Sequence, residues 1–279
     1  WRLLRSSEQK NIKKIESSGL TLKDLFVINV GIATLKDSLY IVDSQNTKTK
    51  DYIKTYKGQD YPVESGLVKS LYKISDFENQ DACDLNSKKI IFPYKIVGGK
   101  SIIYPEAELA TAFPLGYQYL LAIQDELNSR GKEPLNPFYL YGRSQGLNKF
   151  GIRLLTPTFS QRPKFLIVKE KNSLYCNGYG LHLKSDFTNT VGLFDNRPIQ
   201  QEENIDVLQK ILNSEIMHYY VSHTSVSIQG GYPCYQKNFI ELFTIPELNN
   251  EQIIKIRELN EEGLTSYLEE LYSIKLGMP

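Results

Sequence analysis

The chain has 279 residues, of which 41% are hydrophobic and 23% are charged, a composition typical of soluble globular proteins that allows one large domain or two small ones. The formal net charge is only +1, which excludes a strongly basic chain that binds nucleic acid through its overall charge. No run approaches the roughly 18 apolar residues of a membrane span, so the sequence predicts no membrane partner.

The predicted elements begin with a helix. The opening letters WRLLRSSEQK resemble the middle of a helix, so we expect an excised portion of a longer protein. A short amphipathic linker helix is predicted within about 1–19, where Ile12 and Ile15 share one side and Gly19 ends it. The segments 24–34 and 38–43 are predicted as strands, and the segment 48–61 as a surface loop.

Further strands and helices follow in turn. Gly98 and Gly99 predict a hairpin turn. The other predicted strands are 67–74, 88–97, 101–105, 165–170 and 180–185. The other predicted helices are 105–113, 115–130, 203–218 and a C-terminal pair within 250–276 that is broken near Gly263. Many short strands with a few helices predict an α+β fold.

Charge and cysteines are unevenly distributed. Between Gly142 and Lys171 there are seven basic residues and one acid, whereas 247–275 contains seven acids and three bases. A basic middle suits a polyanion, and an acidic end is expected to pack on protein. The three cysteines are far apart and form no CxxC pair, which predicts free thiols and a cytoplasmic location.

Two segments combine glycines with side chains that can pair with bases. The first, NPFYLYGRSQGLNKFGIRLLTPTF, covers 136–159, and the second covers 212–246 around Gly230 and Gly231. Glycine lets a backbone approach a ligand closely, and Arg, Gln and Asn pair bidentately with base edges. These segments are the candidate binding loops.

The same segments carry a family resemblance. The strings YGRSQGLNKFG, LLTPTF, YCNGYG, LNSEIMHYY and SVSIQGGYPCYQKNF resemble the target-recognition domain of adenine-N6 DNA methyltransferases, in particular the Eco57I-type branch and its TaqI-like specificity domain. The segments 28–43 and 66–77 fit the same family. The resemblance covers nearly the whole chain in order.

The resemblance implies a division of labour within a longer polypeptide. It implies that 1–249 is a β-rich DNA target-recognition body and that 250–279 is a C-terminal helical hairpin, without a catalytic methyltransferase domain in this chain. The parent protein would be an adenine-specific enzyme of a type II restriction-modification system. Its catalytic domain would use S-adenosylmethionine, whereas this chain would need no cofactor. The partners would be double-stranded DNA and that methyltransferase domain.

Candidate contacts follow from the side chains of the two loops. The candidates for reading bases are Arg143, Ser144, Gln145, Asn148, Gln229, Tyr232 and Gln236. The candidates for contacting phosphates are Lys149, Arg153, Lys164 and Lys237. The loop glycines are Gly142, Gly146, Gly230 and Gly231. No catalytic residue and no metal ligand is assigned.

Two alternative functions remain open. One is a type I restriction specificity subunit, although only one recognition-like unit is present. The other is a serine hydrolase, because the residues from Gly142 to Gly146 match the G-x-S-x-G nucleophile elbow with Ser144 as nucleophile and Asp195 or Asp206 with His218 or His223 downstream. An elbow requires a strand before it and a helix after it, and LNKFG is a poor start for a helix.

Three other motifs are assigned structural roles. Asn136-Pro137-Phe138-Tyr139 resembles the catalytic Asn-Pro-Pro-Tyr of adenine methyltransferases but lacks the second proline. Gly99-Lys100-Ser101 resembles the end of a phosphate-binding loop but lacks its earlier glycine, so it is predicted to be a hairpin turn. The three histidines lack zinc-site spacing.

Overall fold

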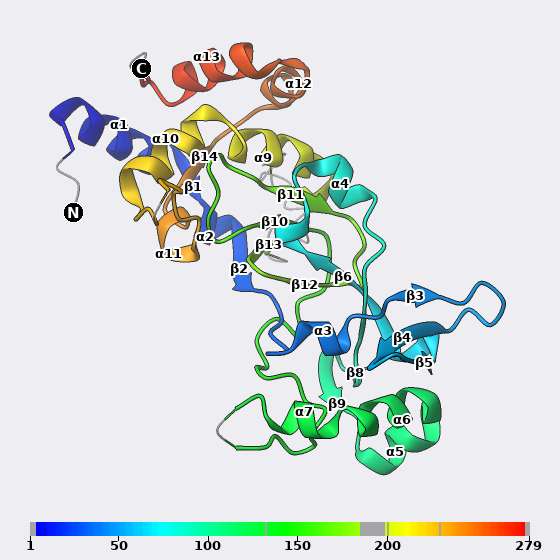
Figure 1. Ribbon diagram of the computed structural model, residues 1–279. Coiled ribbons are helices and arrows are strands. Elements are labelled where there is room, and N and C mark those ends of the chain that lie inside the picture. The colour runs from blue at the N-terminus through cyan, green and yellow to red at the C-terminus, as the bar shows by residue number, and fades with distance from the viewer. Residues whose placement is uncertain (1–3, 132, 185–198, 200, 229, 277–279) are drawn as a thin grey trace.

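The structure is a computed structural model that describes residues 4–131, 133–184, 199, 201–228 and 230–276. Helices and several small sheets alternate along the chain, which confirms the predicted α+β fold. In Figure 1 a four-stranded sheet lies in the middle, the C-terminal helices lie above it, and the β3–β5 sheet and helices α5–α7 lie below.

The four-stranded sheet has the order β11-β10-β13-β2, with antiparallel neighbours. Its strands are β2 (Phe26–Val30), β10 (Arg153–Thr156), β11 (Leu166–Val168) and β13 (Tyr179–Leu183). Every residue of β10 is buried. The sheet joins residues that are more than 150 positions apart and therefore organises the chain around it.

The remaining strands form smaller sheets. A three-stranded sheet contains β12 (Leu174–Cys176), β6 (Val68–Lys73) and β7 (Lys89–Ile91), with β12 and β6 parallel. An antiparallel sheet contains β3 (Ser44–Gln45), β4 (Tyr52–Tyr56) and β5 (Gln59–Val63). Two pairs complete the set, namely β8 (Tyr94–Val97) with β9 (Lys100–Ile103), and β1 (Gly19–Thr21) with β14 (Thr244–Pro246).

The helices fall into two groups along the sequence. Those that precede β10 are α1 (Ser6–Ser17), α2 (Leu22–Leu25), α3 (Asp37–Tyr40), α4 (Gln80–Asp84), α5 (Glu106–Ala112), α6 (Pro114–Ala122) and α7 (Gln124–Asn128). The later helices are α9 (Ile205–Leu212), α10 (Glu215–Thr224), α11 (Lys237–Ile240), α12 (Asn250–Glu258) and α13 (Glu261–Leu271). Short 3₁₀ turns cover Ser65–Leu67, Ile74–Asp76 and Glu202–Asn204.

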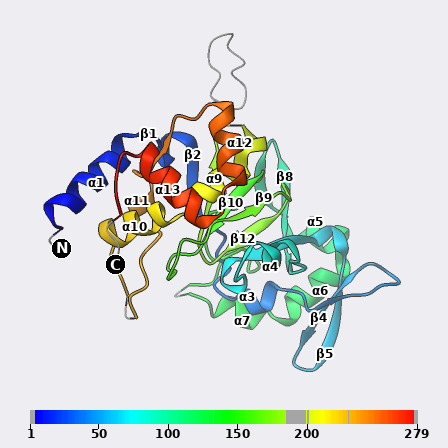
Figure 2. The same cartoon turned by 90° about the horizontal axis from the view of Figure 1, so that it is seen from above.

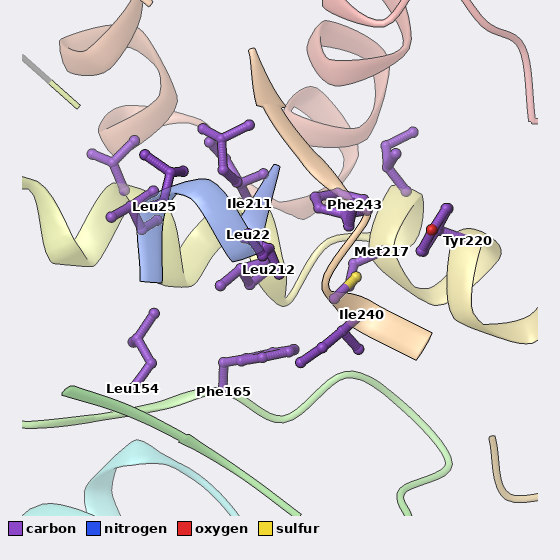
Figure 3. Packing of buried hydrophobic residues seen from close by; sticks show 14 of the residues in the cluster. Leu22, Leu25, Leu154, Phe165, Ile211, Leu212, Met217, Tyr220, Ile240 and Phe243 are labelled. Carbon is purple, nitrogen blue, oxygen red and sulfur yellow. The ribbon is translucent and has the colours of Figure 1, made fainter. Parts of the chain in front are cut away.

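The largest hydrophobic core joins the two ends of the described chain. It includes Ile12 and Ile15 of α1, residues of α9 and α10, and the inner faces of α12 and α13. Figure 3 shows Phe165 and Leu154 of the sheet side facing Ile211 and Leu212 of α9. A second core, within 32–176, packs under α3, α5, α6 and the β3–β5 sheet.

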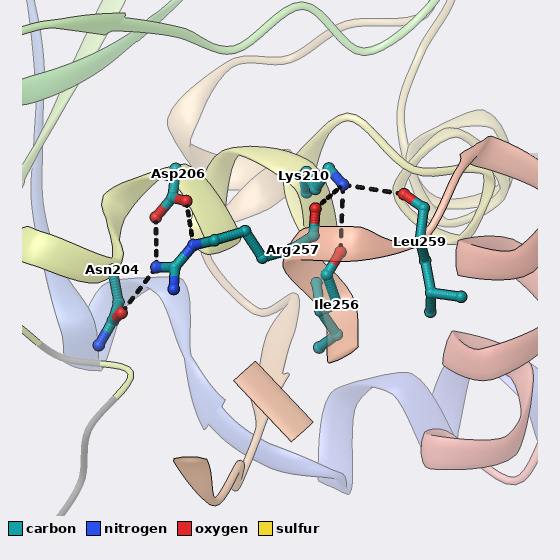
Figure 4. A network of polar contacts seen from close by, with 6 residues as sticks. All are labelled: Asn204, Asp206, Lys210, Ile256, Arg257 and Leu259. Atoms are coloured by element: carbon teal, nitrogen blue, oxygen red, sulfur yellow. Dashed lines mark hydrogen bonds and ion pairs between the residues drawn. The ribbon is translucent and has the colours of Figure 1, made fainter. Parts of the chain in front are cut away.

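The two acidic C-terminal helices pack on other helices of the chain, α12 on α9 and α13 on α10 (Figure 2). Arg257 donates from Nε and Nη2 to the Asp206 carboxylate at 2.5 and 3.0 Å, and Lys210 Nζ donates to the last carbonyl oxygens of α12 (Figure 4). A lysine at that position also opposes the negative end of the helix dipole. Asn249 and Asn260 cap the two helices. The break lies at Leu259–Asn260 rather than near Gly263.

Several predicted elements need correction. The segment 38–43, predicted as a strand, contains most of α3, and the segment 48–61, predicted as a surface loop, contains β4 and the first residues of its antiparallel partner β5. The predicted helix 203–218 breaks at Ser214, whose side chain accepts a hydrogen bond from Met217 N. The predicted helix 115–130 breaks at Ile123. The helix predicted within about 1–19 is observed as α1, and the hairpin at Gly98–Gly99 is confirmed.

Candidate nucleic-acid interface

The 142–149 loop is held against the end of β2 by backbone contacts. Arg143 N donates to Ala33 O at 3.1 Å, and the two residues form an isolated antiparallel bridge. Gly146 has φ +74°, and a Cβ atom there would lie 2.7 Å from Gly31 C and 2.9 Å from Ile32 N. Only glycine therefore fits at this position without displacing backbone.

Buried aromatic side chains support this loop from below. Tyr139 is fully buried and its hydroxyl donates to Tyr104 O, while Tyr141 donates to Ile91 O. Arg130 donates to the carbonyl oxygens of Thr34 and Phe138. The two tyrosines therefore belong to the core that fixes the loop.

The loop presents its polar side chains outward. Arg143, Ser144, Gln145 and Asn148 are exposed, and Lys149 is half-buried. Asn148 Oδ1 accepts a hydrogen bond of 2.5 Å from Ser101 N, which leaves its amide nitrogen and one lone pair of the oxygen available. Arg143 and Gln145 have no side-chain partner among the described residues, so both can turn toward a ligand.

The 225–237 loop is a hairpin. Ser227 pairs with Pro233, Ile228 N donates to Tyr232 O, and the turn is closed by Gly230 and Gly231 with φ values of +96° and +79°. Tyr232 is exposed, Gln236 is half-buried and Lys237 is exposed. Gln229, which we expected to read bases, lies outside the described residues.

The two loops lie at the same end of the four-stranded sheet. Tyr179 at the start of β13 pairs with Val30 and with Thr156, the last residues of β2 and β10. The 142–149 loop contacts Gly31, directly after Val30. Tyr235 in the 225–237 loop donates from its backbone N to Thr158 O, two residues after Thr156. Two segments that are distant in sequence therefore form one composite edge.

This edge lacks negative charge along its own segments. Residues 134–169 contain six basic residues and no acid, and residues 216–240 contain no acid either. Gln161 and Arg162 also lie here, because Gln161 Nε2 donates to Tyr232 Oη at 3.3 Å. Arg162 forms an ion pair with Glu215, so its charge is already balanced. The sequence interpretation counted Arg162 in the basic run from Gly142 to Lys171 but named neither residue as a DNA contact. The edge suits a polyanion.

Two predicted phosphate contacts are contradicted or weakened by burial. Arg153 is fully buried and donates to Gly151 O, Ser173 O and Ser173 Oγ, so it cannot reach a phosphate. The strand β10 turns it inward. Lys164 is half-buried, and its Nζ donates to Phe77 O at 2.6 Å, so a phosphate would have to compete with that bond. Lys149 and Lys237 remain as candidates.

The geometry does not support the alternative catalytic motifs. The residues before Gly142 form no strand and those after Ser144 form a turn, so the strand–turn–helix frame of a nucleophile elbow is missing here. The aromatic ring of Tyr139 is buried and cannot stack on a flipped base. Asp195 lies outside the described residues.

Lys100 lies in the β8–β9 hairpin, as predicted for the glycine-lysine-serine motif. Across the part of the chain that the structure describes, no group of three or more His, Cys, Asp or Glu residues could hold a metal ion. In the same residues, no helix is both long enough and apolar enough to cross a membrane.

His182 beneath the 142–149 loop makes stability depend on pH. Burial, with the nearby charges of Arg153 and Lys149, lowers the pKa of this imidazole to about 4. The unfolded chain, with a histidine pKa of about 6.5, therefore binds more protons between these values, and stability is complete above 6.5 and falls as the pH falls toward 4. We expect a loss of up to about 3 kcal/mol in the free energy of unfolding, measured by urea titration across this range.

The matched variant is His182→Gln, which keeps a polar side chain without a titrating ring. It should show a clearly smaller loss of stability across the same pH range. His218, whose pKa burial also lowers, should account for part of the remaining slope. An unchanged slope in His182→Gln would contradict the assignment.

No family model matches this chain. Over 258 residues the chain is 22% identical to the type II restriction enzyme and methyltransferase RM.Eco57I of Escherichia coli, and the match covers 87% of this chain and 25% of that protein. This chain thus spans about a quarter of that relative. The match relates the chain to restriction-modification enzymes.

A solved structure is also similar. The type IIL restriction-modification enzyme MmeI in complex with DNA gives a TM-score of 0.49 at 11% sequence identity, and the match covers 93% of this chain and 34% of that chain.

Proposed function

We propose that this chain is the double-stranded DNA recognition domain of a cytoplasmic, adenine-N6-specific methyltransferase of a type II restriction-modification system. The observation that carries the proposal is the composite edge, where two glycine-containing loops present amide, guanidinium and ammonium groups without an acid in either segment. The sequence similarity to a restriction enzyme and methyltransferase supports the same assignment. Methyl transfer with S-adenosylmethionine would belong to another part of the parent polypeptide.

The side chains of the edge have distinct proposed roles. Arg143 can donate two hydrogen bonds to guanine, and Gln145 can pair bidentately with adenine. Lys149 and Lys237 would contact phosphates and so set the register of the protein on the duplex. Ser144, Tyr232 and Gln236 would add base contacts beside them. Asn148, whose oxygen already accepts a hydrogen bond from Ser101, would position the loop and offer its amide nitrogen to a base.

Selection from a random duplex library tests the proposal. The chain is mixed with the library, bound duplexes are recovered and sequenced, and the affinity of the recovered motif is measured over a salt series. A motif of several base pairs, with log affinity falling linearly against log salt, is expected. The experiment is repeated with the full-length parent and S-adenosylmethionine. If neither protein enriches a motif or binds at low salt, DNA recognition is excluded.

Arg143→Ala is expected to relax specificity at one position of that motif. The loss of a bidentate contact should reduce discrimination there by about 1–3 kcal/mol, while the other positions keep theirs. The measurement is the affinity for duplexes that carry each base pair at each position. The control is Lys48→Ala, which removes an exposed charge from the distant β3–β4 turn. An equal effect of both variants would show that Arg143 contributes only charge.

A further inference from the structure

The β8–β9 pair is a two-stranded ribbon that projects beside the 142–149 loop. Val97 pairs with Lys100 across the Gly98–Gly99 turn, and Lys95 pairs with Ile102. Both glycines have positive φ, and a Cβ atom on either would meet nothing within 4 Å. The tip of the ribbon therefore stands in open space.

The two faces of the ribbon differ. Paired residues of antiparallel strands project to the same face, so Tyr94, Ile96 and Ser101 share one face, the inner one. Tyr94 fixes that face to the core, whereas Ile96 nearer the tip is 42% exposed. Val97 and Ile102 lie on the outer face and are 52% and 45% exposed. The outer face therefore places two exposed aliphatic side chains beside the exposed Lys100.

The ribbon is connected directly to the proposed base-reading loop. Ser101 N donates to Asn148 Oδ1 at 2.5 Å, and Ser101 Oγ donates to Leu147 O at 2.6 Å. Tyr139, just before the loop, bonds to Tyr104 at the end of the ribbon. A ligand that contacts Arg143 and Gln145 is therefore close to a second, rigidly positioned element.

The charge of the ribbon indicates which ligand this is. Residues 85–105 contain four lysines and no acid. Lys95 is neutralised by Glu108 at 2.6 Å, whereas Lys100 has no ion-pair partner among the described residues. A free ammonium group beside an apolar surface matches a duplex groove, which offers phosphates at its rim and thymine methyl groups inside. An acidic protein surface would complement the charge of Lys100 but would leave the exposed side chains of Val97 and Ile102 without an apolar partner.

We propose that the β8–β9 ribbon is a third DNA-contacting element, which enters the major groove with Val97 and Ile102 toward base edges and Lys100 on a backbone phosphate. A two-stranded ribbon fits the width of that groove. This inference rests on the proposed function, since it assigns a further element to the same duplex. It also gives Lys100 a role other than the phosphate-binding loop that its local sequence suggests.

Lys100→Ala tests the phosphate contact. Loss of one contact lowers the slope of log affinity against log salt by about 0.9. A fourfold rise in salt should therefore weaken the wild-type chain by about 3.5-fold more than the variant. Lys48→Ala, which removes an exposed lysine from another sheet, should keep the wild-type slope. A wild-type slope and affinity in Lys100→Ala would overturn the contact.

Lys100→Cys tests the position of the ribbon. Cys83, Cys176 and Cys234 are all buried, so an iron–EDTA reagent should label the new thiol selectively. Radical cleavage of the selected duplex should give cuts inside or next to the motif, displaced toward the 5′ side on the two strands as for a source in the major groove. Lys48→Cys, labelled in the same way, should give no localised cuts.

The outcomes separate this inference from the function on which it rests. If the wild-type chain binds a motif but labelled Lys100→Cys produces no localised cuts while bound, the ribbon faces another partner and the inference is wrong. Cuts displaced toward the 3′ side would place the tip in the minor groove and overturn the major-groove assignment. If the wild-type chain and its full-length parent bind no DNA, the proposed function itself fails.

Discussion

Gly146→Ala is expected to destabilise the chain by about 3 kcal/mol or more and to abolish selective DNA binding. The positive φ of +74° alone costs an alanine about 1–2 kcal/mol. The added Cβ would also lie within 3.0 Å of the backbone at Gly31 and Ile32, and backbone atoms cannot move aside as a flexible side chain can. The 142–149 loop would have to lift from β2 and carry Arg143 with it.

Gly58→Ala is the matched control for this experiment. Gly58 has φ +79°, nearly the same as Gly146, but nothing lies within 4 Å of its added Cβ. The free energy of unfolding of this variant should fall only by the cost of the positive φ, about 1–2 kcal/mol. Its DNA binding should be normal, because β4–β5 is remote from the composite edge. Urea denaturation of both variants gives the comparison. Equal losses of stability in the two variants would mean that the close approach of Gly146 to the backbone after β2 adds nothing to the cost of the substitution.

The fold was predictable where local signals agreed with tertiary packing. Helix α1 buries Ile12 and Ile15 as its periodicity predicts, and Gly98–Gly99 forms the turn that this dipeptide favours. The parallel pairing of β12 with β6 joins positions about 100 residues apart. No periodicity within either strand specifies that partner, so the sequence alone could not give the arrangement of the sheets.

Two wrong predictions show how context overrides local pattern. The run of apolar residues at 38–43 looks like a strand, but Thr34 bonds to Asp37 and α3 forms, with Leu39 and Tyr40 in the core. The lysine-rich 48–61 segment looks like a loop, but Lys54 is held by Asp43 at 3.1 Å inside a hairpin. Strand preference depends on cross-strand partners. The partner carboxylate of Lys54 belongs to Asp43, which precedes β3 and lies outside the 48–61 segment.

The segments of the proposed site were predictable, but the exposure of their individual residues was not. Glycines together with base-pairing side chains mark 136–159 and 212–246 without a structure, and the structure narrows them to the loops 142–149 and 225–237. The sequence does not show which of their side chains are exposed, because exposure depends on the direction in which each side chain projects from its strand or loop. Arg153 and Arg143 look equivalent in the sequence, yet one is fully buried and the other is exposed. The sequence pattern therefore assigned the wrong role to one of two similar arginines.

The buried Arg153 leads to the second large prediction. Its guanidinium lies 5.3 Å from the centre of the Tyr175 ring and donates to Gly151 O, Ser173 O and Ser173 Oγ. Burial lowers the pKa of this guanidinium. Arg153→Ala should reduce the free energy of unfolding by about 3–5 kcal/mol, because it opens a cavity and leaves buried carbonyl oxygens without donors.

Arg153→Met separates packing from charge at the same position. Methionine fills much of the volume and removes the unfavourable burial of a charge, so its loss should be smaller than that of alanine by about 1–2 kcal/mol. The folded Arg153→Met chain should keep the wild-type salt dependence of DNA binding, because a buried guanidinium contacts no phosphate. Suppose instead that Arg153→Met is as stable as the wild-type chain and its salt slope falls by about 0.9. The arginine would then face DNA in solution, and β10 would present that side chain outward in the complex.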